Sequence, residues 1–137
     1  MSGGARLFVG VLVALAPLIG AGTRAQTPPA QRPEYLPFAE FASDDSAAQQ
    51  SAKRSYNDAV ERYNKALYDY HVTLGQLNQL VDTYNGAGTG AEREKARADA
   101  APLRVKLEAL RRDAVTLAAA VDQARRKASQ AGVTLTP

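Results

Sequence analysis

Cysteine is missing from this chain of 137 residues, and histidine occurs once, as His71. The absence of cysteine excludes disulfides, a lipoprotein anchor and a thiol nucleophile, so an exported form must be stabilised by packed helix faces or by partners. A lone histidine excludes a histidine cluster that binds a metal. The glycines at 86–90 are not preceded by a strand or followed by the Gly-Lys-Ser/Thr of a phosphate-binding loop. We therefore predict that the protein is not an enzyme and has no cofactor.

Charge is missing from residues 7–22, an apolar run that follows Arg6. The run is short for a membrane span, Pro17 interrupts it, and small residues up to Ala25 fit signal-peptidase cleavage. We predict that residues 1–25 are a cleaved signal peptide and that the protein is exported, either periplasmic or secreted; the alternative is an uncleaved N-terminal anchor. Cleavage removes two arginines and no acidic residue, which lowers the formal net charge from +3 to +1. A nucleic-acid partner therefore has little support.

Prolines concentrate in residues 26–42, which contain four of the seven in the chain. They remove amide donors and favour extended or polyproline conformations, so this stretch is predicted to be a linker. Its aromatic residues are too apolar for a freely solvated spacer, and we expect Phe38 and Phe41 to dock on the helices. The alternative is a disordered leader.

Apolar residues follow a heptad repeat over residues 56–85. Aliphatic residues at Val60, Leu67, Leu74 and Val81 alternate with Tyr56, Tyr63, Tyr70, Leu77 and Tyr84. The pattern predicts a helix from about 44 to 85, capped by Ser43, with aliphatic residues at heptad position a and tyrosines at position d. We interpret the tyrosine rings as the core of a helix–helix seam; an aromatic groove for a ligand is the alternative.

A second helix follows a glycine-rich turn. Gly86 is placed for a left-handed C-cap, and Thr89 with Glu92 forms a capping-box pattern that opens a helix over about 90–131. Pro102 predicts a kink in this helix, or a helix that begins later, near Asp99.

The predicted fold is all-α, a long antiparallel two-helix hairpin resembling a coiled coil. It comprises a signal peptide at 1–25, a Pro-rich segment at 26–42, the hairpin at 43–132 and a frayed or loosely docked tail at 133–137. A tight turn sets Tyr56 opposite Val121 and Tyr70 opposite Leu107, and a register shifted by one heptad is the alternative.

Two flanks of the hairpin are candidate surfaces. Position e of the second helix carries Arg97, Arg104, Arg111 and Arg125, which face the column of Asn57, Asn64, His71, Asn78 and Asn85 on the first helix. This flank has many donors and few carboxylates, so it is a candidate anion-binding edge, or else a solvated flank on which asparagine carbonyls accept from the arginines. The opposite flank is apolar, and its candidate association surface consists of Ala59, Ala66, Leu80, Val115, Ala119 and Ala120.

The run 115–121 is apolar almost all round, which a two-helix hairpin cannot bury. A partner is therefore expected: a second copy of the chain, another envelope protein, or the Phe38/Phe41 segment. The sequence favours an exported, non-enzymatic hairpin that acts through protein–protein association, as an oligomeric scaffold or envelope adaptor, with no membrane span after cleavage. The alternative is a binding module for an anionic ligand or envelope polymer along the arginine edge.

Overall fold

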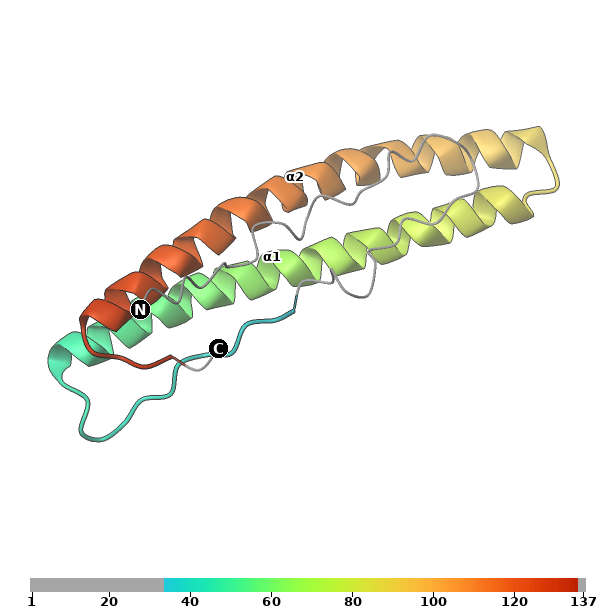
Figure 1. Cartoon of the computed structure of the whole chain (residues 1–137). Coiled ribbons are helices and arrows are strands. Elements are labelled where there is room, and N and C mark those ends of the chain that lie inside the picture. The colour runs from blue at the N-terminus through green and yellow to red at the C-terminus, as the bar shows by residue number, and fades with distance from the viewer. Residues whose placement is uncertain (1–33, 136–137) are drawn as a thin grey trace, which may run out of the picture.

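The structure, a computed structural model, describes residues 34–135. Helix α1 spans Ala47–Gly86 and helix α2 spans Gly90–Gln130, and the two pack side by side as a long hairpin (Figure 1). This confirms the predicted all-helical two-helix hairpin. The predicted signal peptide and residues 26–33 of the Pro-rich segment lie outside the described residues. In the described part of the chain, neither helix contains a segment apolar enough to cross a bilayer.

Both helices begin with a capping box. At α2 the Thr89 hydroxyl accepts the Glu92 N–H at 3.2 Å, and Glu92 Oε2 accepts the Thr89 N–H at 3.2 Å, as predicted. At α1 the cap is Ser46 paired with Gln49, so the predicted cap at Ser43 is wrong. Residues 42–45 form a turn before the helix, in which the Asp45 N–H donates to the Ala42 carbonyl at 3.2 Å. The Asp45 carboxylate binds Lys53 and the Ala42 amide, and not the first amides of the helix.

The helix ends differ from the glycine-based expectation. Gly86 keeps a helical backbone, and the next residue, Ala87, is extended with φ −66° and ψ 129°, so the predicted left-handed cap at Gly86 is wrong. Gly132 adopts φ +79° after α2. The Val133 N–H then donates to the Ala128 carbonyl at 2.9 Å, as in a Schellman motif, and the chain turns back toward the seam.

Helix α2 is continuous through Pro102, which excludes the alternative start near Asp99. A proline leaves the carbonyl four residues earlier without an amide donor. Here that residue, Ala98, is exposed, as is Pro102, so water can hydrate the unpaired carbonyl. The helix therefore tolerates the proline on its solvent face.

Two clusters of buried side chains fill the seam. The first consists of Tyr56, Val60, Tyr63, Leu67, Val121 and Ala124, and the second of Tyr70, Leu77, Ala100 and Leu107. The rings of Tyr56, Tyr63 and Tyr70 thus form core, and Ala100, Ala114 and Ala128 of α2 are buried as well. Helix α1 ends at Gly86 and α2 begins at Gly90, so the turn is short. Tyr56 shares a cluster with Val121, and Tyr70 shares one with Leu107.

The C-terminal tail is docked rather than frayed up to residue 135. Val133 is buried, and Leu135 packs against the first cluster. Of the two expected states, frayed or loosely docked, residues 133–135 adopt the docked one. The turn at Gly132 explains the docking, since it directs the chain back along the hairpin (Figure 1).

Candidate functional site

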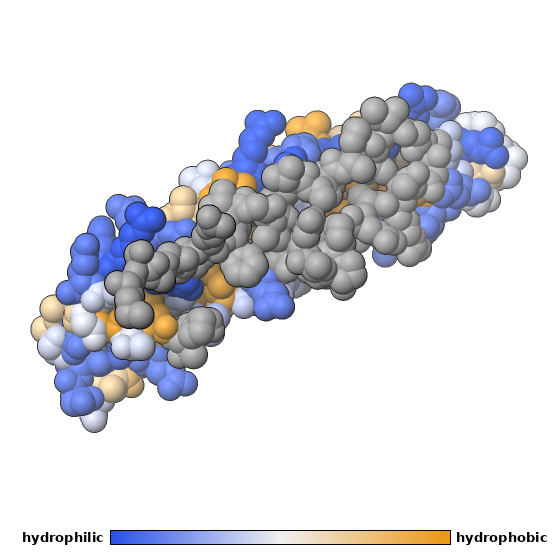
Figure 2. Space-filling view, viewed as in Figure 1, coloured by the Kyte–Doolittle hydropathy of each residue, from blue (hydrophilic) through white to orange (hydrophobic). Residues whose placement is uncertain are grey.

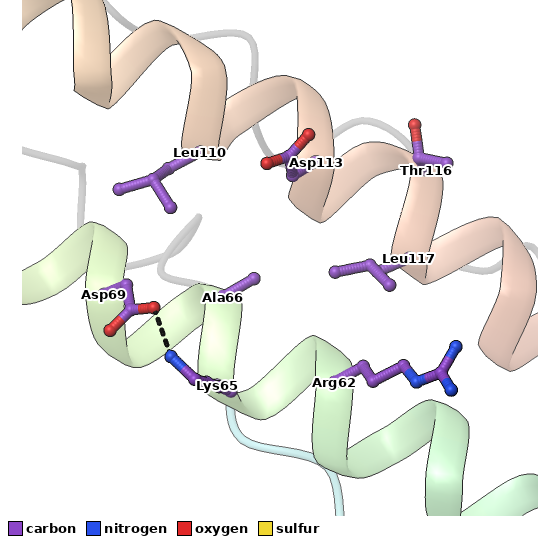
Figure 3. A pocket seen from close by; sticks show the side chains of 8 residues that line it. All are labelled: Arg62, Lys65, Ala66, Asp69, Leu110, Asp113, Thr116 and Leu117. Atoms are coloured by element: carbon purple, nitrogen blue, oxygen red, sulfur yellow. Dashed lines mark hydrogen bonds and ion pairs between the residues drawn. The ribbon is translucent and has the colours of Figure 1, made fainter.

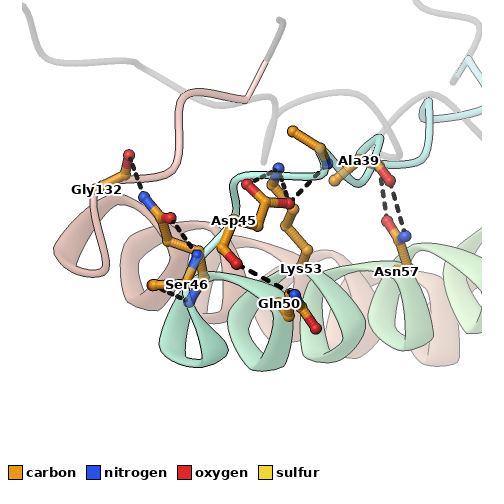
Figure 4. A network of polar contacts seen from close by, with 9 residues as sticks. Ala39, Asp45, Ser46, Gln50, Lys53, Asn57 and Gly132 are labelled. Carbon is orange, nitrogen blue, oxygen red and sulfur yellow. Dashed lines mark hydrogen bonds and ion pairs between the residues drawn. The ribbon is translucent and has the colours of Figure 1, made fainter.

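The leader, residues 34–46, runs antiparallel to α1 and is held there by two asparagines. Asn57 Oδ1 accepts the Ala39 N–H at 2.7 Å, and its Nδ2 donates to the Ala39 carbonyl at 3.0 Å (Figure 4). Asn64 binds Leu36 in the same way, at 2.8 and 2.9 Å. Each carboxamide thus satisfies both main-chain groups of one leader residue, much as a neighbouring strand would.

The spacing of these contacts has a simple geometric cause. Asn57 and Asn64 are one heptad apart, about 10.5 Å along a helix that rises 1.5 Å per residue. Leu36 and Ala39 are three residues apart, about 9.3 Å in a polyproline helix and about 9.9 Å in a strand. One heptad of α1 therefore matches three residues of an extended chain.

The same three-residue step separates the faces of the leader. Leu36 and Ala39 lie on its docked face and pack against the first cluster. The residues that precede them, Tyr35 and Phe38, face solvent at 53% and 55% exposure. Phe41, three residues after Phe38, is 51% exposed. The prediction that Phe38 and Phe41 dock on the helices is therefore wrong. The asparagines bind the main chain of Leu36 and Ala39, so these contacts do not depend on the aromatic rings.

An ion pair fixes the bend between the leader and α1. Lys53 Nζ lies 2.7 and 2.6 Å from the two carboxylate oxygens of Asp45, and the Lys53 and Asp45 side chains are 11% and 9% exposed (Figure 4). The Ala42 N–H also donates to Asp45 Oδ2, at 2.8 Å. The hydrogen bonds from Lys53 and from the Ala42 amide lower the pKa of Asp45 below 3.8. The leader thus has a charged anchor where it joins the helix.

A groove of about 390 Å³ opens along the seam. It is lined by Arg62, Lys65, Ala66, Asp69, Leu110, Asp113, Thr116 and Leu117 (Figure 3). Ala66 and Asn64 occupy heptad positions g and e, which lie on opposite sides of the seam, so the groove and the leader are on different flanks. The Lys65 ammonium pairs with Asp69 at 2.8 Å.

The structure divides the predicted association surface. Ala66 lines the groove, whereas Ala59 and Leu80 pack against the first and second clusters. Val115, Ala119 and Ala120 are exposed on α2 but do not line the groove. Leu110 and Leu117 pack against the second and first clusters, and both remain half-buried and line the groove, because two helices cover only one side of these positions.

Large hydrophobic side chains also reach the surface outside the groove. Those on the helices are Tyr68, Val72, Val105 and Val115. Hydrophilic residues cover most of the outer edges of the hairpin, and hydrophobic residues surface in patches between them (Figure 2).

The arginine edge is less open than expected. Arg97 lies 3.9 Å from Glu94, and Arg111, 27% exposed, lies 3.5 Å from Glu108. The expectation of few carboxylates on this flank is therefore wrong for these two arginines. Arg104 and Arg125 are half-buried, and the Nε atom of each is shielded from solvent without a hydrogen-bond partner.

The asparagine column also differs from the expected solvated flank. The carbonyls of Asn57 and Asn64 accept leader amides instead of arginine donors. The His71 ring stands edge-to-face to Tyr70, with ring centroids 5.7 Å apart. Sequence reasoning missed main-chain binding by these asparagines. The available signal was an asparagine every seven residues beside a leader whose apolar residues recur every three.

Comparisons of the chain with protein-family models, curated proteins and solved structures returned no match. Within residues 34–135, no group of three or more histidine, cysteine or acidic side chains could hold a metal ion. The candidate site therefore consists of the groove and the docked leader.

Proposed function

We propose that this protein is an exported, non-enzymatic hairpin that acts through protein–protein association, as an oligomeric scaffold or envelope adaptor. The observation that supports this function is the groove on the flank opposite the described leader, where Ala66, Leu110 and Leu117 form an apolar lining between charged side chains. An apolar surface with a polar rim is typical of association sites.

A second copy of the chain is the partner that the charges of the groove favour. Arg62 and Lys65 contribute positive charge, and Asp69 and Asp113 contribute negative charge. A twofold dimer presents the same patch from both subunits, so that patch must be self-complementary. A groove with both signs in equal number meets this requirement, whereas a groove of one sign would repel its copy.

The test is the solution mass of residues 26–137, measured by light scattering over a range of concentrations. Thr116 is exposed in the groove, and its hydroxyl donates to the carbonyl four residues earlier at 3.2 Å. Thr83 is a matched control, because it is exposed near the end of α1 and makes the same type of bond at 2.9 Å. We expect dimers of the unaltered chain and of Thr83→Arg, and monomers of Thr116→Arg.

Apolar association should persist at high salt, because screening weakens mainly the charged rim. An unaltered chain that stays monomeric at every concentration would contradict self-association. Equal association of Thr116→Arg and the control would show that the groove is not the interface.

The second candidate function is binding of an anionic ligand or envelope polymer along the arginine edge. Its support is the pair Arg104 and Arg125, whose Nε donors have no partner within the described residues. Arg104→Gln combined with Arg125→Gln should weaken retention on an anionic matrix, because it removes both of these charges. Unchanged retention would rule out this candidate.

The proposed export and cleavage can be tested by the intact mass of the protein. The intact mass of the protein recovered from an exporting host should correspond to a chain that begins at Gln26. Full-length chain in the membrane fraction would instead support an N-terminal anchor.

A further inference from the structure

We propose that the tip of the hairpin, residues 73–104, opens as a separate unit while the base stays folded. The base is the rest of the described chain, and it contains the first cluster, the described leader and the tail. Opening of the tip separates α1 from α2 next to the turn and exposes Leu77 and Ala100 of the second cluster. The inference does not depend on the function proposed above, because every residue that lines the groove belongs to the base.

Packing is uneven along the hairpin. Leu36 and Ala39 of the leader and Leu135 of the tail pack against the first cluster, so segments outside the helices contribute to the base. Within the described chain, the partly buried hydrophobic residues around the second cluster come from the two helices alone: Leu74, Leu80, Leu103 and Leu110. The described leader and the tail both lie toward the end away from the turn (Figure 1). Regions with fewer buried contacts open at a lower free-energy cost, which favours opening of the tip before the base.

The seam becomes thinner toward the turn. After Leu77, the one buried residue of the described α1 is Val81, and before Ala100, the one buried residue of α2 is Ala96. Hydrophobic stabilisation is roughly proportional to the apolar area that is removed from water, and an alanine side chain contributes little area. The closed state of the tip therefore gains little from apolar burial.

A buried hydroxyl adds a cost to the closed state. Thr73 is 0% exposed, and its Oγ1 atom has no hydrogen-bond partner within the described residues. The hydroxyls of Thr83 and Thr116 instead donate to the carbonyl four residues earlier. A buried hydroxyl without a partner loses its hydration, and opening of the tip restores it. Thr73 therefore favours the open state.

Two backbone features weaken the helices in the same stretch. Gly75 of α1 and Pro102 of α2 both lie within the span of the second cluster. Glycine loses more conformational freedom than other residues when it becomes helical, and proline removes one hydrogen bond of the helix. Both residues are exposed, so burial does not offset either cost. The two helices are thus weakened at the same end of the hairpin.

Amide hydrogen exchange of the exported chain, resolved by residue with NMR, measures the opening. Relative to an unstructured peptide, we expect the Leu77 and Val81 amides to exchange about tenfold faster than those of Val60 and Val121 in the base. Low concentrations of urea should accelerate exchange at Val60 more steeply than at Leu77. The reason is that opening of the tip exposes less surface than global unfolding does.

A variant in the tip tests the cause of the opening. Thr73→Val removes the buried hydroxyl and keeps the branched shape, so exchange at Leu77 should become about fivefold slower or more. Thr83→Val is the matched control in the same tip. Its hydroxyl is exposed and already donates to the Gln79 carbonyl at 2.9 Å, so this change should not slow exchange at Leu77.

A variant in the base tests whether the two units are separate. Gly132→Ala destabilises the base, because alanine is strained at a φ of +79°. The strain is present whether the tip is closed or open, so exchange at Leu77 should not change. Val60 exchanges through global unfolding, which relieves the strain, so its exchange should become about fivefold faster.

Three outcomes would overturn the proposal. Equal protection of Leu77 and Val60 in the unaltered chain would show that the hairpin opens only as a whole. Acceleration of both amides by Gly132→Ala would lead to the same conclusion. Exchange at Leu77 that is not slowed by Thr73→Val would show that residue 73 does not belong to the unit that opens.

Discussion

Replacing Asn64 by leucine is the most direct test of how the leader is held. Leucine has nearly the size and branching of asparagine, but it can neither accept from the Leu36 N–H nor donate to the Leu36 carbonyl, which Asn64 contacts at 2.8 and 2.9 Å. A typical intramolecular hydrogen bond contributes about 0.5–1.5 kcal/mol, so the two together contribute about 1–3 kcal/mol. We expect Asn64→Leu to lower the free energy of unfolding by that amount.

Urea unfolding followed by circular dichroism measures this loss, and hydrogen exchange at Leu36 shows where it arises. Gln79→Leu is the matched control, since Gln79 lies on the exposed face of the same helix. The control should leave both the urea midpoint and the Leu36 amide unchanged. If Asn64→Leu also left the Leu36 amide protected, the asparagine would not be what holds the leader.

The double variant adds a test of cooperativity. If the leader detaches as one segment, losing one asparagine already releases part of the contact made by the other. Asn57→Leu with Asn64→Leu should therefore cost less than the sum of the single changes. Strict additivity would mean that the two contacts form independently.

Four further predictions concern stability. Leu67→Ala should lower the free energy of unfolding by about 2–5 kcal/mol, because Leu67 is 1% exposed in the first cluster. The control Glu61→Ala, at an exposed position, should change the urea midpoint little. Equal effects would mean that the seam is misassigned. Gly75→Ala should stabilise the protein by about 0.5–1 kcal/mol, because the added Cβ meets nothing within 4 Å on a helical backbone, and a loss would contradict this. Gly132→Ala should instead lower the melting temperature, because φ is +79° there. The lowered pKa of Asp45 stabilises the fold above pH 3.8, and this contribution disappears as the pH falls through the folded-state pKa. Acid unfolding of Asp45→Asn should lack that component, and identical acid profiles would refute the coupling.

Local patterns in the sequence were sufficient for the hairpin and its core. The heptad repeat places Tyr56 and Leu67 on one stripe of α1, and burying such a stripe requires a second helix with a matching one. The capping box at Thr89 and Glu92 could also be predicted, since it joins residues only three apart. Gly132 as the end of α2 belongs to the same class. These features depend on neighbours in the chain, so the sequence by itself determined them.

Only the tertiary structure decided where the leader lies and which surface it leaves open. Phe38 has the greater apolar area, but Ala39 is the residue that docks. Asn57 binds the main chain of Ala39 and is 18 residues away in the sequence, so only the folded structure brings the two together. The cap at Ser46 likewise became clear only with the bend anchored between Asp45 and Lys53. Contacts of this kind join segments that only the fold brings together. Local signals such as the large ring of Phe38 or the earlier serine, Ser43, therefore could not show which residue docks or which residue caps the helix.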